Sequence, residues 1–143
     1  MEVNKRLVRC KVISERGELE TTLDLDIKQE GKICTLKVKG HLKSGDPVIQ
    51  FDAAVQSALS SGHIFLVLDL EAMPYLDSSG IGAIVDALRN ATKLGGDVKL
   101  VNPSSFASKT FKMVGILNLF GVYTSQAEAI AACGSARGEL SEG

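Results

Sequence analysis

Hydrophobic and polar residues alternate in the first third of the chain, a pattern typical of β-strands. The segment Leu7–Ile13 alternates and predicts a first strand. Leu23–Ile27 and Cys34–Val38 alternate on either side of a turn at Gly31, which predicts a β-hairpin with one face exposed to solvent. We expect this hairpin to end at Gly40.

A different pattern begins after the hairpin, where apolar residues recur at helical spacing. Asp46 is expected to cap a helix that has Pro47 at its first position and that ends at Gly62. The continuous apolar run Ile64–Leu68 then predicts a central strand that is covered on both faces. After it we expect a helix between the Asp77–Gly80 junction and Gly95 and a strand at Val98–Val101. A third helix is expected to be capped by Ser104 or Ser105, with Phe106, Thr110, Met113 and Val114 facing inward. A short strand at Leu119–Tyr123 and a helix capped by Ser125 complete the order.

The order of these elements predicts an α/β fold, an open, mixed and mostly parallel β-sheet with about four helices packed against it. Residues 21–134 are expected to form this domain. Residues 1–20 are expected to be an N-terminal extension that forms an extra strand or an arm, and the polar residues 135–143 a flexible tail. Loops that follow the carboxyl ends of parallel strands carry function in such sheets, and the Asp77–Gly80 junction is one of these loops.

Composition narrows the classes of function. The chain has 143 residues, 45% of them hydrophobic and 23% charged, which is typical of one globular domain. A formal net charge of -1 and the absence of tryptophan argue against nucleic acid or an anionic membrane as a partner. Apolar runs are too short to span a bilayer and Met1–Cys10 lacks the apolar core of a signal peptide, so we expect a cytoplasmic protein. The cysteines, Cys10, Cys34 and Cys133, are odd in number and lack a CxxC spacing, which favours free thiols.

The stretch Tyr75–Gly82 places an acid, two adjacent serines and two glycines where a buried strand passes into the start of a helix. The first N–H groups of a helix lack intrahelical partners and its dipole favours negative charge, so the position suits a hydroxyl that carries or contacts a phosphate. The simplest alternative is that one of the serines is only the helix cap, with Asp77 adding favourable charge. One cap needs one hydroxyl, however, and Gly80 and Gly82 lower helix propensity while leaving room for a partner's backbone. This combination favours a contact surface.

No enzyme motif is complete in this sequence. The segment Gly80–Gly82 begins like a dinucleotide-binding fingerprint, but Val85 stands where the third glycine would be. The histidines, His41 and His63, have no spacing to Cys or acidic residues that suggests a metal site, and a Gly-x-Ser-x-Gly nucleophile elbow is missing. We therefore expect a protein that is not an enzyme and that has no catalytic residues, cofactor or metal.

Two stretches of the sequence are similar to a known family. Leu68–Leu70 followed by Tyr75–Gly82, and later Gly95–Asn102, resemble the STAS domain family and specifically its bacterial anti-sigma factor antagonists. The resemblance covers about Leu23–Cys133 and includes Phe106–Leu119, which looks like the family's third helix and following loop. It implies the STAS fold, a mixed sheet with four helices.

The resemblance also implies partner switching in the regulation of transcription. Antagonists of this kind bind a cytoplasmic anti-sigma factor that is also a serine kinase, and thereby free a sigma factor. The kinase uses ATP to phosphorylate the first serine of the Asp-Ser-Ser-Gly block, here Ser78, which releases the antagonist, and a PP2C-type phosphatase resets it. The resemblance places two groups of residues at the surface that meets the partner. The first surrounds the phosphorylated serine, and the second lies in the loop after the second strand of the family fold. Together they are Asp77, Ser79, Gly80, Ile81, Gly82, His41 and Asp46.

The chain departs from the family at that corner. Antagonists usually carry Gly-Glu-Leu-Asp after the second strand, whereas here His41 and Lys43 replace the acids and only Asp46 remains near the helix start. The identity of the kinase is therefore open. Two other functions also stay open: an accessory subunit of a transporter ATPase, since STAS domains also serve lipid-transport complexes, and a sensor that holds a nucleotide's phosphates at Ser78–Gly82. The intact serine pair favours the phosphorylation switch, while the Leu7–Ile13 strand leaves the choice between monomer and homodimer open.

Overall fold

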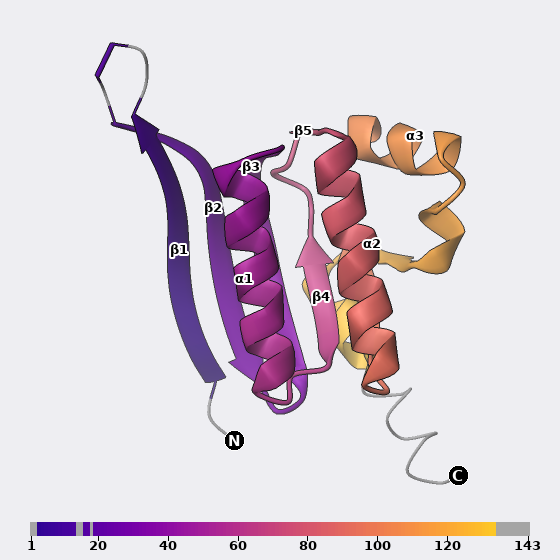
Figure 1. The fold of residues 1–143 in the computed structure, drawn as a ribbon. Helices are drawn as coiled ribbons and strands as arrows, with labels where there is room; N and C mark the ends of the chain where they lie inside the picture. The colour runs from indigo at the N-terminus through magenta and orange to yellow at the C-terminus, as the bar shows by residue number, and fades with distance from the viewer. Residues whose placement is uncertain (1–2, 14–15, 18, 134–143) are drawn as a thin grey trace, which may run out of the picture.

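The computed structural model describes residues 3–13, 16–17 and 19–133. They form a seven-stranded sheet in the order β1-β2-β3-β4-β6-β7, with β5 paired to β3 (Figure 1). The β1–β2 and β2–β3 pairs are antiparallel, and the other pairs are parallel. The strands are β1 (Val3–Ile13), β2 (Leu19–Glu30), β3 (Ile33–Leu42), β4 (Phe65–Asp69), β5 (Tyr75–Leu76), β6 (Asp97–Val101) and β7 (Gly121–Tyr123). The helices are α1 (Asp46–Ser60), α2 (Ser78–Lys93), α3 (Ser105–Met113), a 3₁₀ turn at Leu117–Leu119 and a helical segment at residues 126–133. The expected α/β fold is thus confirmed.

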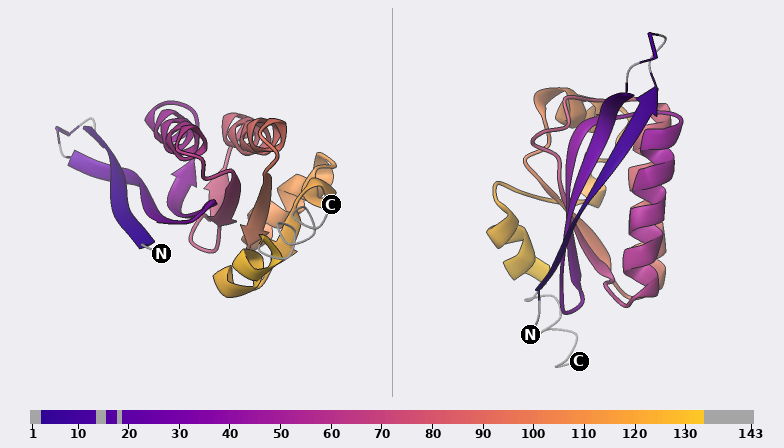
Figure 2. Two further views of the ribbon diagram at one scale, coloured as in Figure 1. Left: turned by 90° about the horizontal axis from the view of Figure 1, so that it is seen from below. Right: turned by 90° about the vertical axis from the view of Figure 1, so that its left-hand side faces the viewer.

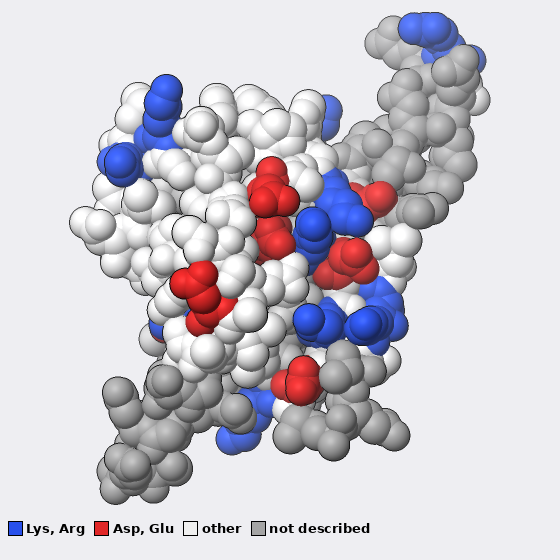
Figure 3. Space-filling view, turned by 180° about the vertical axis from the view of Figure 1, so that it is seen from behind, with Lys and Arg blue, Asp and Glu red and all other residues white. Residues whose placement is uncertain are grey.

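The sheet separates two hydrophobic layers. Helices α1 and α2 cover one face, and the helical segment 126–133 lies against the other (Figure 2). The layer beneath α1 and α2 includes Leu25, Leu36, Phe51, Leu68 and Ile84. The smaller layer contains Ile33, Phe65, Val67, Val101, Ala129 and Cys133. Charged side chains gather on the part of this second face that segment 126–133 leaves uncovered (Figure 3).

The alternating patterns predicted the first strands well. Residues 23, 25 and 27 of β2 are buried, and their neighbours at 24, 26 and 28 are partly or fully exposed. The strand expected at Leu7–Ile13 is confirmed as part of the longer β1, which pairs with β2 along its whole length. The tail expected at residues 135–143 lies outside the described residues.

The hairpin ends at Gly40 as expected, because the pairing of β2 with β3 stops at Leu23 and Gly40, but the strand β3 itself continues to Leu42. Gly40 has a φ of 109°, a backbone conformation that favours glycine, and its N–H donates to the Ala72 carbonyl at 3.0 Å. Beyond this bend the strand leaves β2 and pairs with β5 instead, with His41 opposite Tyr75. Gly40 therefore redirects the strand toward the Asp77–Gly80 junction.

Two details of the helices also differ from expectation. Gly45 is the N-cap of α1 and Asp46 is its first helical residue, so Asp46 is not a cap and makes no capping bond. The residues expected to face inward from α3 do not do so. Met113 is 86% exposed, and Phe106 and Val114 are exposed as well. The buried residues of α3 are Ala107 and Phe111. Ser104 caps this helix as predicted, accepting from the Ala107 N–H at 3.2 Å.

Within the described ranges, none of the helices is long and apolar enough to cross a membrane. The same residues contain no group of three or more His, Cys, Asp or Glu side chains that could hold a metal ion. Cys34 lies in the larger hydrophobic layer, and burial raises the pKa of its thiol to about 11. This thiol is therefore protonated and unreactive at neutral pH.

Candidate functional site

The Asp77–Gly80 block lies at one end of the sheet, where β5 leads into α2 (Figure 1). β5 pairs in parallel with the redirected end of β3, so that Leu42 lies opposite Leu76. The Asp77 N–H then donates to the Leu42 carbonyl at 3.2 Å. These bonds fix the start of α2 beside the loop that joins β3 to α1.

Asp77, and not a serine, caps α2. Its backbone is extended, with φ −102° and ψ −173°, and its Oδ1 accepts a hydrogen bond from the Gly80 N–H at 3.0 Å. The alternative in which Ser78 or Ser79 provides the cap is therefore wrong. Asp is among the strongest N-cap residues because its carboxylate satisfies an N–H that has no partner inside the helix. Since the acid fills this role, neither serine is needed for it.

Ser44, in the loop between β3 and α1, holds the block from outside the helix. Its N–H donates to Asp77 Oδ2 at 2.9 Å, and its hydroxyl lies 3.1 Å from the same oxygen and 2.8 Å from Ser79 Oγ. The Ser44 N–H, followed by the Gly80 N–H, holds the pKa of Asp77 below its ordinary value. The block therefore presents a carboxylate that is ionised at neutral pH. Sequence reasoning missed Ser44, because its contact spans 33 residues and no local pattern indicates it.

Asp77→Ala is expected to lower the free energy of unfolding by about 1–2 kcal/mol at pH 7, because α2 loses its cap. The difference should shrink in acid. A carboxylate with a lowered pKa stabilises the fold above its unfolded pKa of about 3.9, and this stability is lost as the pH falls through the folded pKa. Urea unfolding followed by circular dichroism at neutral and acidic pH measures the difference.

The matched control for this experiment is Asp46→Ala. Asp46 is an exposed acid at the start of α1, but it makes no capping hydrogen bond. It contributes only its charge near the helix dipole, which is worth about 0.3–1 kcal/mol. Equal losses in the two variants would contradict the capping role of Asp77.

The two glycines of the site have different surroundings. A Cβ added to Gly80 would lie 2.2 Å from the Leu42 carbonyl oxygen and 3.1 Å from Leu76 Cβ. A Cβ added to Gly82 would meet nothing within 4 Å, and Gly82 is exposed. The space beside Gly80 is therefore filled by the chain's own backbone. The expectation that Gly80 leaves room for a partner's backbone is wrong. Gly82 does leave open surface.

Ser78 is the first helical residue of α2 and is exposed. Among the hydrogen bonds of the described residues, none involves its hydroxyl. Ser79 is also exposed, but its hydroxyl is bonded to that of Ser44. Ser78 is thus the serine whose hydroxyl is free to react, and it stands at the positive end of the helix dipole.

An aromatic cluster borders the block on the side of α3. The Tyr75 ring lies 5.2 Å from the Phe106 ring and 5.7 Å from the His41 ring, measured between centroids. Tyr75 is 41% exposed and Phe106 is 44% exposed. Exposed apolar side chains that lie together mark interaction surfaces more often than isolated ones do. Tyr75 and Phe106 were not among the residues predicted to contact the partner. For Phe106 the reason is that the helical pattern had assigned it to the core.

We define the docking face as the exposed residues around the block: Tyr75, Ser78, Ser79, Gly82 and Phe106. Of the other residues predicted there, His41 joins it through Tyr75. Ile81 is only partly exposed and packs against the larger hydrophobic layer. Asp46 is exposed at the start of α1, two residues after Ser44, and none of the described hydrogen bonds joins it to the block.

Comparisons with known proteins agree with this architecture. The STAS domain family matches residues 24–129, which contain the whole docking face. An anti-sigma F factor antagonist of Lysinibacillus sphaericus is 30% identical over 70 residues, which cover 48% of this chain and 60% of that relative. The similarity thus spans less than two thirds of the relative's length.

Solved structures share the fold. The anti-sigma factor antagonist SpoIIAA in its unphosphorylated form has a TM-score of 0.68 at 23% identity, covering 80% of this chain and 96% of that one. The Bacillus cell fate determinant SpoIIAA in the phosphorylated form has a TM-score of 0.63 at 23% identity, covering 76% and 97%. An anti-sigma factor antagonist from Mycobacterium paratuberculosis has a TM-score of 0.69 at 17% identity, covering 78% and 94%. With its family match over residues 24–129 and this shared fold, the chain belongs to the STAS domain family and is similar to the anti-sigma factor antagonists within it.

Proposed function

We propose that this protein is an anti-sigma factor antagonist that switches partners through phosphorylation of Ser78. In its unphosphorylated form it binds an anti-sigma factor that is also a serine kinase, and so frees a sigma factor. Phosphorylation of Ser78 releases the kinase, and a PP2C-type phosphatase restores the binding form. The protein itself acts by binding and performs no catalysis.

The free hydroxyl of Ser78 is the observation that carries this proposal. Asp77 caps α2 and Ser44 engages Ser79, so the neighbours of Ser78 are committed to structure while Ser78 is not. A kinase can therefore phosphorylate Ser78 without breaking a bond that holds the fold. Phosphate on Ser79 would instead disrupt the contact with Ser44 that joins α2 to the loop after β3.

The helix start explains why the modified protein should stay folded. Phosphorylation adds about 1.5 to 2 negative charges, and the N-terminus of a helix is a favourable place for them. The nearest acid is Asp77, whose carboxylate is already satisfied by N–H groups of Gly80 and Ser44. The added charge is therefore tolerated in water, where screening is strong.

The same charge opposes docking. A partner that covers the docking face would remove water from Ser78 and from its neighbour Asp77, and two negative groups would then face each other in a desolvated interface. Like charges placed together across or within an interface cost several kcal/mol. The exposed rings of Tyr75 and Phe106 would supply apolar contact area in both states, so phosphorylation changes the charge while the rest of the face stays the same.

Phosphorylation by the candidate switch kinase of the source organism tests the proposal. With kinase and ATP, we expect one phosphate per chain, mapped to Ser78 by mass spectrometry of peptides. Ser78→Ala should remove the modification because it removes the acceptor hydroxyl. Ser79→Ala is the matched control and should still be modified, since it changes the adjacent hydroxyl and leaves the Asp77 cap in place.

Two results would contradict the proposal. One is a phosphate that remains on the Ser78→Ala protein at a comparable rate, which would place the modification elsewhere. The other is the absence of any phosphorylated form with every such kinase, provided that the unmodified protein binds none of them.

A further inference from the structure

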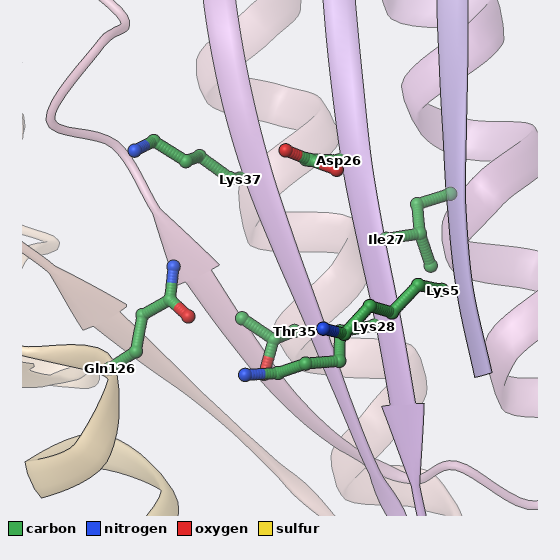
Figure 4. Close-up of a pocket in the computed structure, with 7 residues that line it drawn as sticks. All are labelled: Lys5, Asp26, Ile27, Lys28, Thr35, Lys37 and Gln126. Atoms are coloured by element: carbon green, nitrogen blue, oxygen red, sulfur yellow. The ribbon is translucent and has the colours of Figure 1, made fainter. Parts of the chain in front are cut away.

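A cavity of about 190 Å³ opens on the face of the sheet that points away from α1 and α2 (Figure 4). It lies where the uncovered surface of β1, β2 and β3 meets the start of the helical segment 126–133 (Figure 4). Its walls are Lys5, Asp26, Ile27, Lys28, Thr35, Lys37 and Gln126. The cavity shares none of these residues with the docking face around Ser78.

The strand register concentrates positive charge at one end of this cavity. Lys5 of β1 pairs with Lys28 of β2, and Lys28 pairs with Thr35 of β3, so the three side chains form one row across the sheet. Figure 4 shows both lysine side chains extending toward Thr35. Like charges directly opposite each other destabilise a sheet. Among the described ion pairs, none includes Lys5 or Lys28, so the row holds two ammonium groups without a carboxylate to balance them.

Two acids near the cavity, Asp26 and Asp69, are engaged by other groups. Asp26 lines the cavity, but its Oδ2 lies 3.5 Å from Lys39 Nζ. Asp69, at the end of β4, accepts from Gln126 Nε2 at 2.8 Å and from the Glu71 N–H at 3.2 Å. Both acids thus have partners of their own, and among the described ion pairs neither is joined to Lys5 or Lys28.

We propose that this cavity binds a phosphoryl group, held by the ammonium groups of Lys5 and Lys28 and by the hydroxyl of Thr35. Lysine ammonium and threonine hydroxyl groups donate hydrogen bonds that phosphate oxygens accept, and charge-assisted bonds of this kind are the strong ones. Thr35 lines the cavity and is only 3% exposed, so it lies at the floor of the site. Lys37 and Gln126 line other edges of the cavity and limit its space (Figure 4).

The size of the cavity restricts the ligand. Pockets for drug-sized ligands measure roughly 300–1,000 Å³, and this cavity is smaller. It therefore suits an inorganic phosphate, a pyrophosphate or the head of a small phosphate ester, and a nucleotide base would remain outside. Lys5 lies outside the residues 24–129 that match the STAS family, so the N-terminal strand completes a site that the matched domain alone would lack.

Nuclear magnetic resonance titration with pyrophosphate tests this site, at an ionic strength matched with sodium chloride. Saturable shifts are expected in the backbone amides of Lys5, Lys28 and Thr35. Parallel titrations with inorganic phosphate and with glycerol phosphate show whether a free anion or a phosphate ester binds more tightly. Lys28→Gln should weaken pyrophosphate binding about tenfold, because it removes one charge-assisted hydrogen bond. Lys28→Arg, which keeps the charge, should bind within about threefold of wild type.

Lys109→Gln is the matched control, since it removes one exposed lysine from α3 on another part of the molecule. It should leave pyrophosphate binding unchanged, and so should Ser78→Ala, because the docking face and the cavity share no residue. Thermal unfolding gives a second readout: pyrophosphate should raise the melting temperature of wild type more than that of Lys28→Gln. The proposal is overturned if no anion produces saturable shifts, or if Lys109→Gln weakens binding as much as Lys28→Gln does.

Discussion

Gly80→Ala is expected to lower the free energy of unfolding by about 1–2 kcal/mol after the gain in helix propensity is subtracted, whereas Gly82→Ala is expected to raise it by about 0.5–1 kcal/mol. The two positions lie one helical half-turn apart in α2, and the change in helix propensity is the same in both. Ala is the better helix former, so propensity alone predicts that both variants gain stability. The opposite sign at Gly80 comes from its surroundings.

The Leu42 carbonyl lies too close to Gly80 for a side chain. A Cβ there would lie 2.2 Å from that oxygen, so either α2 or the end of β3 must move. The same carbonyl accepts the hydrogen bond from the Asp77 N–H, and a displacement would weaken that bond as well. Overpacking of this kind costs about 1–3 kcal/mol and exceeds the gain in propensity.

Chemical unfolding of the two variants beside wild type measures the difference. We expect the midpoint of Gly80→Ala to fall and that of Gly82→Ala to rise, with unchanged slopes. Equal stabilisation of both variants would show that α2 does not pack against β3 as described.

Ser78→Asp is expected to fold like wild type and to bind the proposed kinase partner about 150-fold more weakly. Asp at the first position of a helix is favoured by the helix dipole, so stability should be kept. In the complex, the new carboxylate would lie beside Asp77 within a desolvated face. A loss of about 3 kcal/mol in binding corresponds to this factor, and it is enough to change which partner is bound.

Ser78→Asn separates charge from shape in this experiment, because Asn has nearly the same size as Asp and carries no charge. We expect Ser78→Asn to lose much less affinity than Ser78→Asp in calorimetric titrations. If both variants lose the same affinity, the partner excludes the larger side chain and repulsion between charges is the wrong explanation.

The overall fold could be predicted from the sequence because its signals are local. The alternation in β2 and β3, the unbroken apolar run of β4 and the spacing of apolar residues in α1 each reflect which face is buried. Such signals depend on neighbours within a few residues, so a single sequence contains them.

Several features of the fold were missed because they rest on contacts between distant segments or on the choice of face within a short helix. β5 has two residues, too few for any pattern, and it exists because the bend at Gly40 brings the end of β3 beside it. Asp77 caps α2 through a local bond from the Gly80 N–H, but its second carboxylate oxygen is held by Ser44, far away in the sequence, and no local pattern indicates that contact. In α3 the inward face holds Ala107 and Phe111, and a pattern that favours large residues chose Phe106 and Met113 instead.

The position of the Asp77–Gly80 block at a strand–helix junction was therefore predicted more reliably than the arrangement of residues within the block. The block of acid, serines and glycines stood out in the sequence because its residue types are unusual at a strand–helix junction. The separate roles of the residues in the block could be seen only in the structure. Asp77 caps α2, Gly80 packs against the Leu42 carbonyl, and the Ser78 hydroxyl is left free. Tyr75 and Phe106 could be assigned to the docking face only from the structure, because they meet where α3 contacts β5.

The most direct test compares unphosphorylated wild type with wild type phosphorylated at Ser78, each titrated calorimetrically into the kinase partner. A heteronuclear spectrum of each form records whether the fold is kept. We predict that both forms are folded and that the phosphorylated form binds at least about 100-fold more weakly. Equal affinity of two folded forms would contradict the account.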